Sequence, residues 1–466
     1  MKQSLLGVGL AIAIFAPSVA HSMDDMTRQI IERRATEATI WAMPAVNTDL
    51  MYQAFLKAGG GPNQIAVWSR LPSWKNQTLT PNPDTIYLMP FFNTKEVGPV
   101  VLEIPPADTG SITGNIDNVW QVALEDAGPS GADKGKGGKY LILPPGYSKK
   151  IPKGYIPLKS DTYTGYALIR STPKTASEED IAKAVAYGKR VKLYPLSQAG
   201  QTKATKFIDV IDDEFDATIP YDIRFFQSLD RVVQTEPWLE RDRAMIDALK
   251  SLGIEKGKPF SPNAETKAAL EKGAQDATAW LEHQRATAFA PYFDSARWFV
   301  PASAAAVEAQ SDNFADKQNY PTDARAITYS MGYVGIKHLG AGQFYLMTSR
   351  DKAGEPLQGA LNYRLTVPAK APVGQYWSAT VYDGTTHALI RDVDRFSRAS
   401  NTPDLQLGAD GAVNIYFGPV APKGHESNWI PTKAGRNFEV LFRLYQPKKP
   451  LFDKTWILPD IEPNSQ

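Results

Sequence analysis

Apolar residues recur at helical spacing near the start of the chain. From Met26 to about Lys57 their period is close to that of an α-helix, with apolar positions at Ile30, Ile31, Ala35, Ile40, Met43, Leu50 and Phe55. Pro44 is expected to kink or divide this helix, because proline removes a backbone hydrogen bond. The run Gly59-Gly60-Gly61-Pro62 is expected to end it. We therefore predict an N-terminal helical segment within residues 21–60.

Residues 61–175 have a different pattern. Short β-branched and aromatic runs, such as VGPVVLEIPP and KYLILPPGY, are separated by Pro and Gly. Between Ile112 and Glu125 apolar and polar positions alternate, as in a strand with one buried face. Asp117 and Glu125 fall on the polar face of this predicted strand, which would separate them by about 26 Å. The pattern predicts a first β domain, built as an antiparallel sandwich or barrel.

Residues 176–343 are predicted to be mainly helical, and strands return in residues 344–466. Ser177 to Asp180 form an approximate capping box, and further helices are expected near residues 222–252 and 263–288. The later strands are LNYRLTV, YWSATVYD, AVNIYFG and NFEVLFRLY. Because β and α regions are segregated, we predict an α+β, β-rich fold. It would contain two antiparallel β-sandwich (jelly-roll-like) domains and a helical middle region.

The first twenty residues read as a targeting signal. Lys2 provides a positive start, Leu5 to Phe15 an apolar stretch, and Ser18-Val19-Ala20 a small-residue cleavage site. This pattern predicts a signal peptide, residues 1–20, that is cut after Ala20, and hence a periplasmic or secreted protein. No other apolar stretch approaches about 18 residues, so no membrane span is expected.

Composition removes several function classes. The chain has 466 residues, with 51 basic and 50 acidic side chains, so it lacks the basic excess that nucleic-acid binding needs. It has no cysteine, which excludes disulfides, thiolate metal sites and a cysteine nucleophile, and which fits an oxidising compartment. Its five histidines show no metal-ligand spacing, so no metal site is predicted. Neither a Gly-x-Ser-x-Gly elbow nor a dinucleotide fingerprint occurs, and no cofactor is identified.

The strongest chemical candidate is Asp84, which follows Pro81 and Pro83 and precedes an apolar run. Prolines fix the preceding backbone in an extended form, so the Asp84 carboxylate is well placed. Asp84 and Asp117 are the candidate catalytic pair, as acid and base. A turn cap and a solvated strand face are the alternative readings of these two residues.

Candidate ligand-binding residues are aromatic, amide and guanidinium side chains. These groups hold sugars by ring stacking and hydrogen bonding, although they also fill sandwich cores. The candidates are Tyr87, Trp120, Trp377, Tyr382, Arg395, Asn428 and Trp429. The loop 128–140, GPSGADKGKGGKY, has the glycines and lysines of an anion-binding loop, but a flexible connection between strands is favoured.

Several of these stretches resemble known families. TPNPDTIY, VVLEIPP, the Asp117–Trp120 motif and GKYLILPPGY resemble the domain of unknown function 1254. YWSATVYDG, DRFSRAS, SNWIPT and EVLFRLYQP resemble its companion, domain of unknown function 1214. The resemblance implies a β-rich exported bacterial protein with two sandwich-like domains. The families have no established catalytic mechanism, and carbohydrate-related or anion-related roles are what the resemblance suggests.

Three functions remain open from the sequence. The first is an exported enzyme that acts on a small or oligomeric, carbohydrate-like substrate. The second is a non-catalytic periplasmic binding protein for a carbohydrate-like or anionic small ligand. The third is an envelope-assembly protein that binds other protein surfaces or forms a homo-oligomer.

Overall fold

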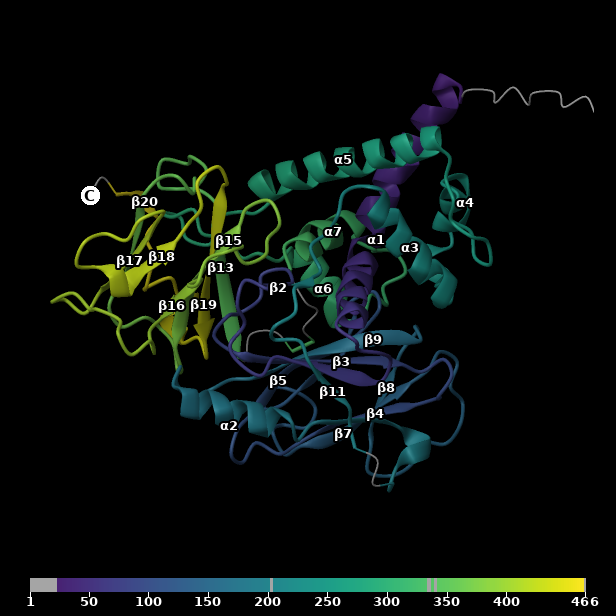
Figure 1. Ribbon diagram of the computed structural model, residues 1–466, viewed down its shortest axis with the longest axis horizontal. Coiled ribbons are helices and arrows are strands. Elements are labelled where there is room, and N and C mark those ends of the chain that lie inside the picture. The colour runs from purple at the N-terminus through teal and green to yellow at the C-terminus, as the bar shows by residue number, and fades with distance from the viewer. Residues whose placement is uncertain (1–22, 202–203, 333–336, 339–341, 465–466) are drawn as a thin grey trace, which may run out of the picture.

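The computed structural model describes residues 23–201, 204–332, 337–338 and 342–464. The predicted signal peptide therefore lies outside the described residues. Figure 1 shows three regions: an N-terminal β region below, a group of helices above it, and a C-terminal β region beside both. The mixed α+β class predicted from the sequence is confirmed.

Helix α1 (Asp25–Lys57) runs through the helical region as its central element. Asp24 caps its start by accepting hydrogen bonds from the backbone N–H groups of Met26 and Thr27. The predicted position of this helix is confirmed, but Pro44 does not divide it. Every residue from Ala38 to Asp49 is buried, since other helices surround this part of α1.

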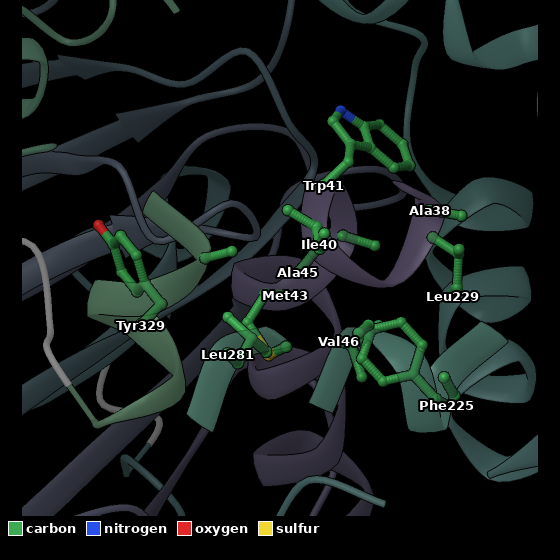
Figure 2. Close-up of a cluster of buried hydrophobic side chains, with 14 of the residues drawn as sticks. Ala38, Ile40, Trp41, Met43, Ala45, Val46, Phe225, Leu229, Leu281 and Tyr329 are labelled. Atoms are coloured by element: carbon green, nitrogen blue, oxygen red, sulfur yellow. The ribbon is translucent and has the colours of Figure 1, made fainter. Parts of the chain in front are cut away.

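The other helices pack around α1. Figure 2 shows Ile40, Met43 and Val46 of α1 among side chains from α3, α5 and α7. The remaining helices are α2 (Glu178–Gly188), α3 (Ile223–Thr235), α4 (Met245–Ser251), α5 (Ala264–Thr287), α6 (Ala304–Ser311), α7 (Thr322–Ser330) and α8 (Lys449–Phe452). Ser177 caps α2 through the N–H of Asp180, as the capping box predicts. None of the helices in the described part of the chain is long and apolar enough to cross a membrane.

The N-terminal β region contains a six-stranded and a four-stranded sheet that share one apolar cluster. The six-stranded sheet has the order β11–β1–β3–β9–β5–β6 and the four-stranded sheet the order β10–β4–β7–β8, while β12 and β2 pair separately. The strands are β1 (Gln64–Val67), β2 (Asn76–Gln77), β3 (Ile86–Asn93), β4 (Val100–Ile104), β5 (Ile112–Asn118), β6 (Ala123–Ala127), β7 (Gly138–Leu143), β8 (Ile156–Lys159), β9 (Thr164–Ser171), β10 (Lys192–Pro195), β11 (Phe207–Asp209) and β12 (Phe215–Asp216).

The C-terminal β region contains two four-stranded sheets, ordered β13–β19–β15–β16 and β18–β17–β14–β20. A second apolar cluster joins them. The strands are β13 (Gln343–Thr348), β14 (Tyr363–Val367), β15 (Trp377–Asp383), β16 (Ser397–Ala399), β17 (Val413–Gly418), β18 (Trp429–Pro431), β19 (Phe438–Tyr445) and β20 (Glu462–Pro463).

Two expectations about the strands are wrong. Three of the four larger sheets are mixed rather than antiparallel, because β1–β11, β7–β8 and β17–β18 pair in parallel, as does the separate pair β2–β12. The sheet β13–β19–β15–β16 is antiparallel throughout, as predicted. No closed sheet occurs among the described strands, and the jelly-roll connectivity stays a prediction.

The second error concerns residues 112–125, which form a hairpin rather than one strand. Ile116 pairs with Glu125 and Asp117 with Ala123, so Asp117 and Glu125 lie on neighbouring strands instead of about 26 Å apart. The Asn118 side chain builds the turn by accepting hydrogen bonds from the N–H groups of Trp120 (2.9 Å) and Val122 (3.0 Å).

Candidate functional site

The loop of residues 78–85, here called the bridging loop, connects the two β regions. It leads from β2 into β3, and it lies against β15, β16 and β19 of the C-terminal region. Two hydrogen bonds are donated by the loop: Thr80 N to His387 O (2.6 Å) and Asn82 Nδ2 to Tyr445 Oη (2.5 Å). Two are donated by the C-terminal region: Tyr382 Oη to Pro81 O (2.6 Å) and Ser397 Oγ to Asp84 Oδ2 (2.8 Å). The stretch that the sequence singles out therefore lies where the two β regions meet.

Asn82 and Asp84 have different roles in this loop. The Asn82 side chain accepts a hydrogen bond from the Asp84 N–H (2.9 Å), so Asn82 caps the turn. The half-buried Asp84 carboxylate faces Ser397 instead. Burial raises the pKa of Asp84, while the Ser397 hydrogen bond and the charges of Arg443 and Arg398 act in the opposite direction. Asp84 thus links the two regions across their boundary.

Asp117 lies on β5, fully buried. Its Oδ2 accepts a hydrogen bond from Asn115 Nδ2 (2.8 Å), while its Oδ1 has no partner among the described residues. Burial raises the pKa of Asp117 well above its ordinary value, and the nearby Asp126 charge raises it further. Asp84 and Asp117 therefore have different charged neighbours, and no hydrogen bond within the described chain joins them. The catalytic role of this pair stays a prediction.

Two arginines form the electrostatic centre of the boundary. Arg170 of β9 is half-buried, and its Nε donates to the Tyr87 hydroxyl (3.4 Å) while its guanidinium lies 5.3 Å from the centre of the Tyr87 ring. Arg443 of β19 is only 2% exposed. It donates to Thr380 Oγ1 (2.9 Å), Thr80 O (3.0 Å) and Tyr382 Oη (2.5 Å). The two cations therefore have mainly neutral oxygen partners.

Neither arginine forms an ion pair with a carboxylate in the described part of the chain. An arginine stays charged in proteins, and a buried charge without a counter-charge is costly. Arg443 also leaves its Nε without a partner in that part of the chain. Because the Arg443 Nε is itself buried, the capacity to bind an anion rests mainly on Arg170, whose hydrogen bond to Tyr87 is long.

Two cavities open beside these arginines. One, of about 600 Å³, has mostly polar residues in its lining and is here called the amide-rich cavity; its amide side chains are Asn82, Asn115, Asn401, Gln343, Gln375 and Gln446. The other, of about 490 Å³, has mostly apolar walls and is here called the apolar cavity. Asn82, Asn115, Arg170 and Gln343 line both cavities, and Arg443 lines the apolar one. Volumes of this size are typical of small-molecule sites.

The other sequence candidates divide into two groups. Tyr87 lines the apolar cavity, and the Tyr382 hydroxyl accepts a hydrogen bond from the Arg443 guanidinium. The rest belong to the cores or to loop structure and line neither cavity. Trp120 packs on Trp41 (4.8 Å between ring centres) and Trp377 stacks on Phe442 (5.3 Å).

Arg395, Asn428 and Trp429 hold the backbone of the C-terminal region. Arg395 donates to the carbonyls of Glu426 and Trp429, and Asn428 bonds the backbone of Gln406 and Asn414. The Trp429 indole N–H donates to Gly418 O (2.9 Å). These contacts are those of a structural scaffold.

The glycine-rich loop 128–140 is held by a carboxylate of the chain itself. Asp133 Oδ1 accepts hydrogen bonds from the Gly128 N–H and the Tyr140 hydroxyl, both at 2.6 Å. Only its Pro129 and Ser130 end reaches the amide-rich cavity. Within the described chain, no group of three His, Asp or Glu side chains is arranged to hold a metal ion.

Sequence reasoning missed Asn82, Arg170 and Arg443. Arg170 occurs in the strand segment ALIRS and Arg443 in VLFRLY, so each is a single charge within an apolar run. A charge in a buried strand requires an explanation, and this signal could have identified both.

Comparison with known proteins gives the families but no activity. Residues 62–195 match a protein of unknown function, DUF1254, and residues 342–449 match another, DUF1214. No curated protein matches the chain. The crystal structure of VPA0106 from Vibrio parahaemolyticus is similar, with 18% identity and a TM-score of 0.55 over 94% of this chain and 100% of that chain. An uncharacterized protein from Burkholderia cenocepacia has 10% identity and a TM-score of 0.40, over 94% of this chain and 95% of its own.

Proposed function

We propose that this chain, which carries a DUF1254 domain and a DUF1214 domain, binds a small organic anion between its two β regions. The observation that carries the proposal is the pair of arginines, half-buried Arg170 and buried Arg443, which border the apolar cavity without an ion-pair partner in the described chain. Arginine recognises carboxylates through paired N–H donors in a fixed geometry. An anion seated there would give the two arginines the ion pair that neither forms in the described chain.

The test is calorimetric titration with a panel of anions, supported by thermal shift. The panel contains acetate, citrate, glucuronate, phosphate and sulfate, with neutral glucose for comparison. At about a hundred times its dissociation constant, a ligand stabilises the folded state by about 2.7 kcal/mol. At least one organic anion is expected to bind, and glucose to bind far more weakly. A carbohydrate-like ligand, suggested by the family resemblance, would appear as a preference for glucuronate.

Matched variants assign the binding to the boundary. Arg170→Gln is expected to weaken binding by tenfold or more, since a hydrogen bond to a charged group contributes about 1.5–3 kcal/mol. Arg190→Gln is the control, because Arg190 pairs with Asp108 on the surface, away from the cavities. Equal losses in both variants, or no binding by any anion, would contradict the proposal.

A catalytic function remains the alternative. The raised pKa values of Asp84 and Asp117 support it, because a general acid needs a proton near neutral pH. The two functions are separated by turnover: an anion recovered chemically unchanged after long incubation supports binding, and any product supports an enzyme. Loss of that product in both Asp84→Asn and Asp117→Asn would assign the acid and base roles.

We also propose that the protein is exported to the periplasm or secreted. Support comes from the order of charged, apolar and small residues in positions 1–20. The intact mass of the protein from a periplasmic fraction should correspond to cleavage after Ala20, whereas an uncut chain in the cytosol would contradict export. Size-exclusion chromatography of the same material tests the envelope-assembly alternative through a stable oligomer or partner.

A further inference from the structure

We infer that the ligand is an amphipathic carboxylate, whose charged group lies at Arg170 and Arg443 and whose apolar body fills the apolar cavity. This inference rests on the proposed anion binding and adds the chemical class of the ligand. It follows from the unequal walls of the two cavities that Arg170 borders.

The polar end of the apolar cavity is well defined. Both arginines are there, together with the side chains of Asn82 and Gln343 and the ring of Tyr345, which lies 5.4 Å from the Arg443 guanidinium. Tyr382 and Thr380 fix Arg443 from the side of the C-terminal sheet. No acidic side chain lines this cavity among the described residues. A carboxylate therefore meets donors and positive charge and no acidic group on the described part of the cavity wall, while the Asp84 charge acts on Arg443 from outside the lining.

The rest of the cavity offers almost no hydrogen bonds. Its walls come from the start of α6 (Val307), from β13 (Phe344 and Met347), from β19 (Leu441) and from Phe452 of α8. A sugar ring placed there would leave hydroxyl groups without partners, which is costly. An alkyl chain or an aromatic ring would instead remove apolar surface from water.

The lining is also adaptable and partly open. Met331 and Met347 have flexible thioether side chains that adjust to ligands of different shape. Phe452, which lines the cavity, is 47% exposed. Burying Phe452 against a bound apolar body would remove this exposed surface from water.

The amide-rich cavity would favour a polar ligand instead of an amphipathic one. It contains Lys174 and His338 in addition to Arg170, but Asp126 also lines it. Polar parts of a ligand could extend into it through the shared residues Asn115 and Gln343. The carboxylate at Arg170 would then lie between an apolar body and a polar extension.

A chain-length series tests the inference on the mature protein, residues 21–466. Acetate, butanoate, hexanoate and octanoate are titrated by calorimetry, with 1-octanol as the neutral control. Each added methylene that enters the cavity should tighten binding by about fourfold, the equivalent of about 0.8 kcal/mol. Octanol should bind at least tenfold more weakly than octanoate, because it lacks the charge that the arginines recognise.

Two variants of α6 locate the apolar body. Val307 lines the cavity, whereas Ala305 on the same helix is exposed and does not. Val307→Trp should abolish the gain with chain length while acetate still binds, and Ala305→Trp should behave as the wild type. Because the series on the wild-type protein needs no substitution, misfolding of a variant leaves the test intact.

The two proposals fail in different ways. If short anions bind through Arg170 but affinity does not increase with chain length, the amphipathic ligand is wrong and anion binding stands. If no carboxylate of any length binds, both proposals are wrong. If octanol binds as tightly as octanoate, the cavity is apolar but the arginines do not recognise the ligand, which also contradicts both.

Discussion

Arg325 and Arg170 both lie over aromatic rings inside the protein, but only Arg170 borders a cavity that could hold a ligand. Arg325 of α7 is fully buried, with its guanidinium 4.7 Å from the centre of the Tyr320 ring and 5.6 Å from that of Trp120. Arg170 likewise lies over Tyr87, and neither arginine has an ion-pair partner in the described chain. Arg325, however, lines neither the amide-rich nor the apolar cavity, whereas Arg170 lines both.

The difference lies in what the donors can reach. Arg325 donates to the carbonyl of Trp41 (2.8 Å) and to the Tyr320 hydroxyl, and it ties α7 to α1 inside the helical core. Arg170 has a single long hydrogen bond, to Tyr87, and open space beside it. A cation among aromatic rings is thus not a binding site in itself. It becomes a candidate when donors remain unused next to a cavity.

The largest expected effect concerns stability. Arg325→Met should lower the free energy of unfolding by about 3 kcal/mol, because it removes the guanidinium hydrogen bonds to the Trp41 carbonyl and the Tyr320 hydroxyl inside the helical core. Arg170→Met should change it by less than about 1 kcal/mol, since it removes only one long hydrogen bond. Urea titration followed by far-UV circular dichroism measures both. Equal losses would show that Arg170 is a structural residue like Arg325.

The second effect concerns the geometry of the anion contact. Arg443→Lys keeps the positive charge but loses the planar fork, so binding of the best anion should weaken by about tenfold, or about 1.4 kcal/mol. Arg364→Lys, at a half-exposed ion pair with Glu462, is the matched control and should bind as the wild type does. Unchanged affinity in Arg443→Lys would mean that charge alone attracts the ligand.

A smaller effect is expected at Asp84, whose charge acts on Arg443 and Arg398. Asp84→Asn should tighten anion binding by about threefold, because it removes a negative charge that competes with the ligand; this corresponds to about 0.6 kcal/mol. The pKa of Asp84 is raised, so wild-type affinity should increase as the pH falls and the carboxyl is protonated. Asp84→Asn should lose this increase, and Ser397→Ala should keep it. Calorimetry at several pH values is the measurement.

A separate prediction concerns the pH dependence of stability at Asp117. Its folded-state pKa lies above the unfolded value, so the folded state holds the proton more tightly. Stability should therefore decrease as the pH rises from the unfolded-state pKa towards the folded-state pKa. Asp117→Asn resembles the protonated form and should weaken this dependence in thermal melts between pH 4 and 8. An unchanged slope would indicate that another group, such as Asp126, causes it.

The sequence was sufficient for the main elements and insufficient for their pairing. The long N-terminal helix, the Ser177 cap and the strands of the C-terminal region follow from local patterns. The hairpin turn at residues 118–122 could not be predicted from a local pattern, because it contains neither Gly nor Pro. It depends on the Asn118 side chain and on a positive φ of 55° at Gln121, which an alternating pattern does not reveal.

The site was only partly predictable for a related reason. The bridging loop was identified through Asp84 and Tyr87, both of which lie at the boundary. Arg170 and Arg443 come together from β9 and β19, which are 273 positions apart in the chain, and no local pattern connects them. Aromatic residues were poor indicators of a binding site, because Trp120 and Trp377, both predicted to bind a ligand, pack against other rings in the cores.

The most direct test of anion binding at the boundary is a crystal of the mature protein soaked in 4-iodobenzoate, whose iodine is located by anomalous diffraction. We expect one dominant iodine site within the apolar cavity, near Val307 and Phe344, with the carboxylate within hydrogen-bonding distance of Arg170 or Arg443. Iodine sites scattered over the surface, or a cavity filled with water at saturating 4-iodobenzoate, would contradict it.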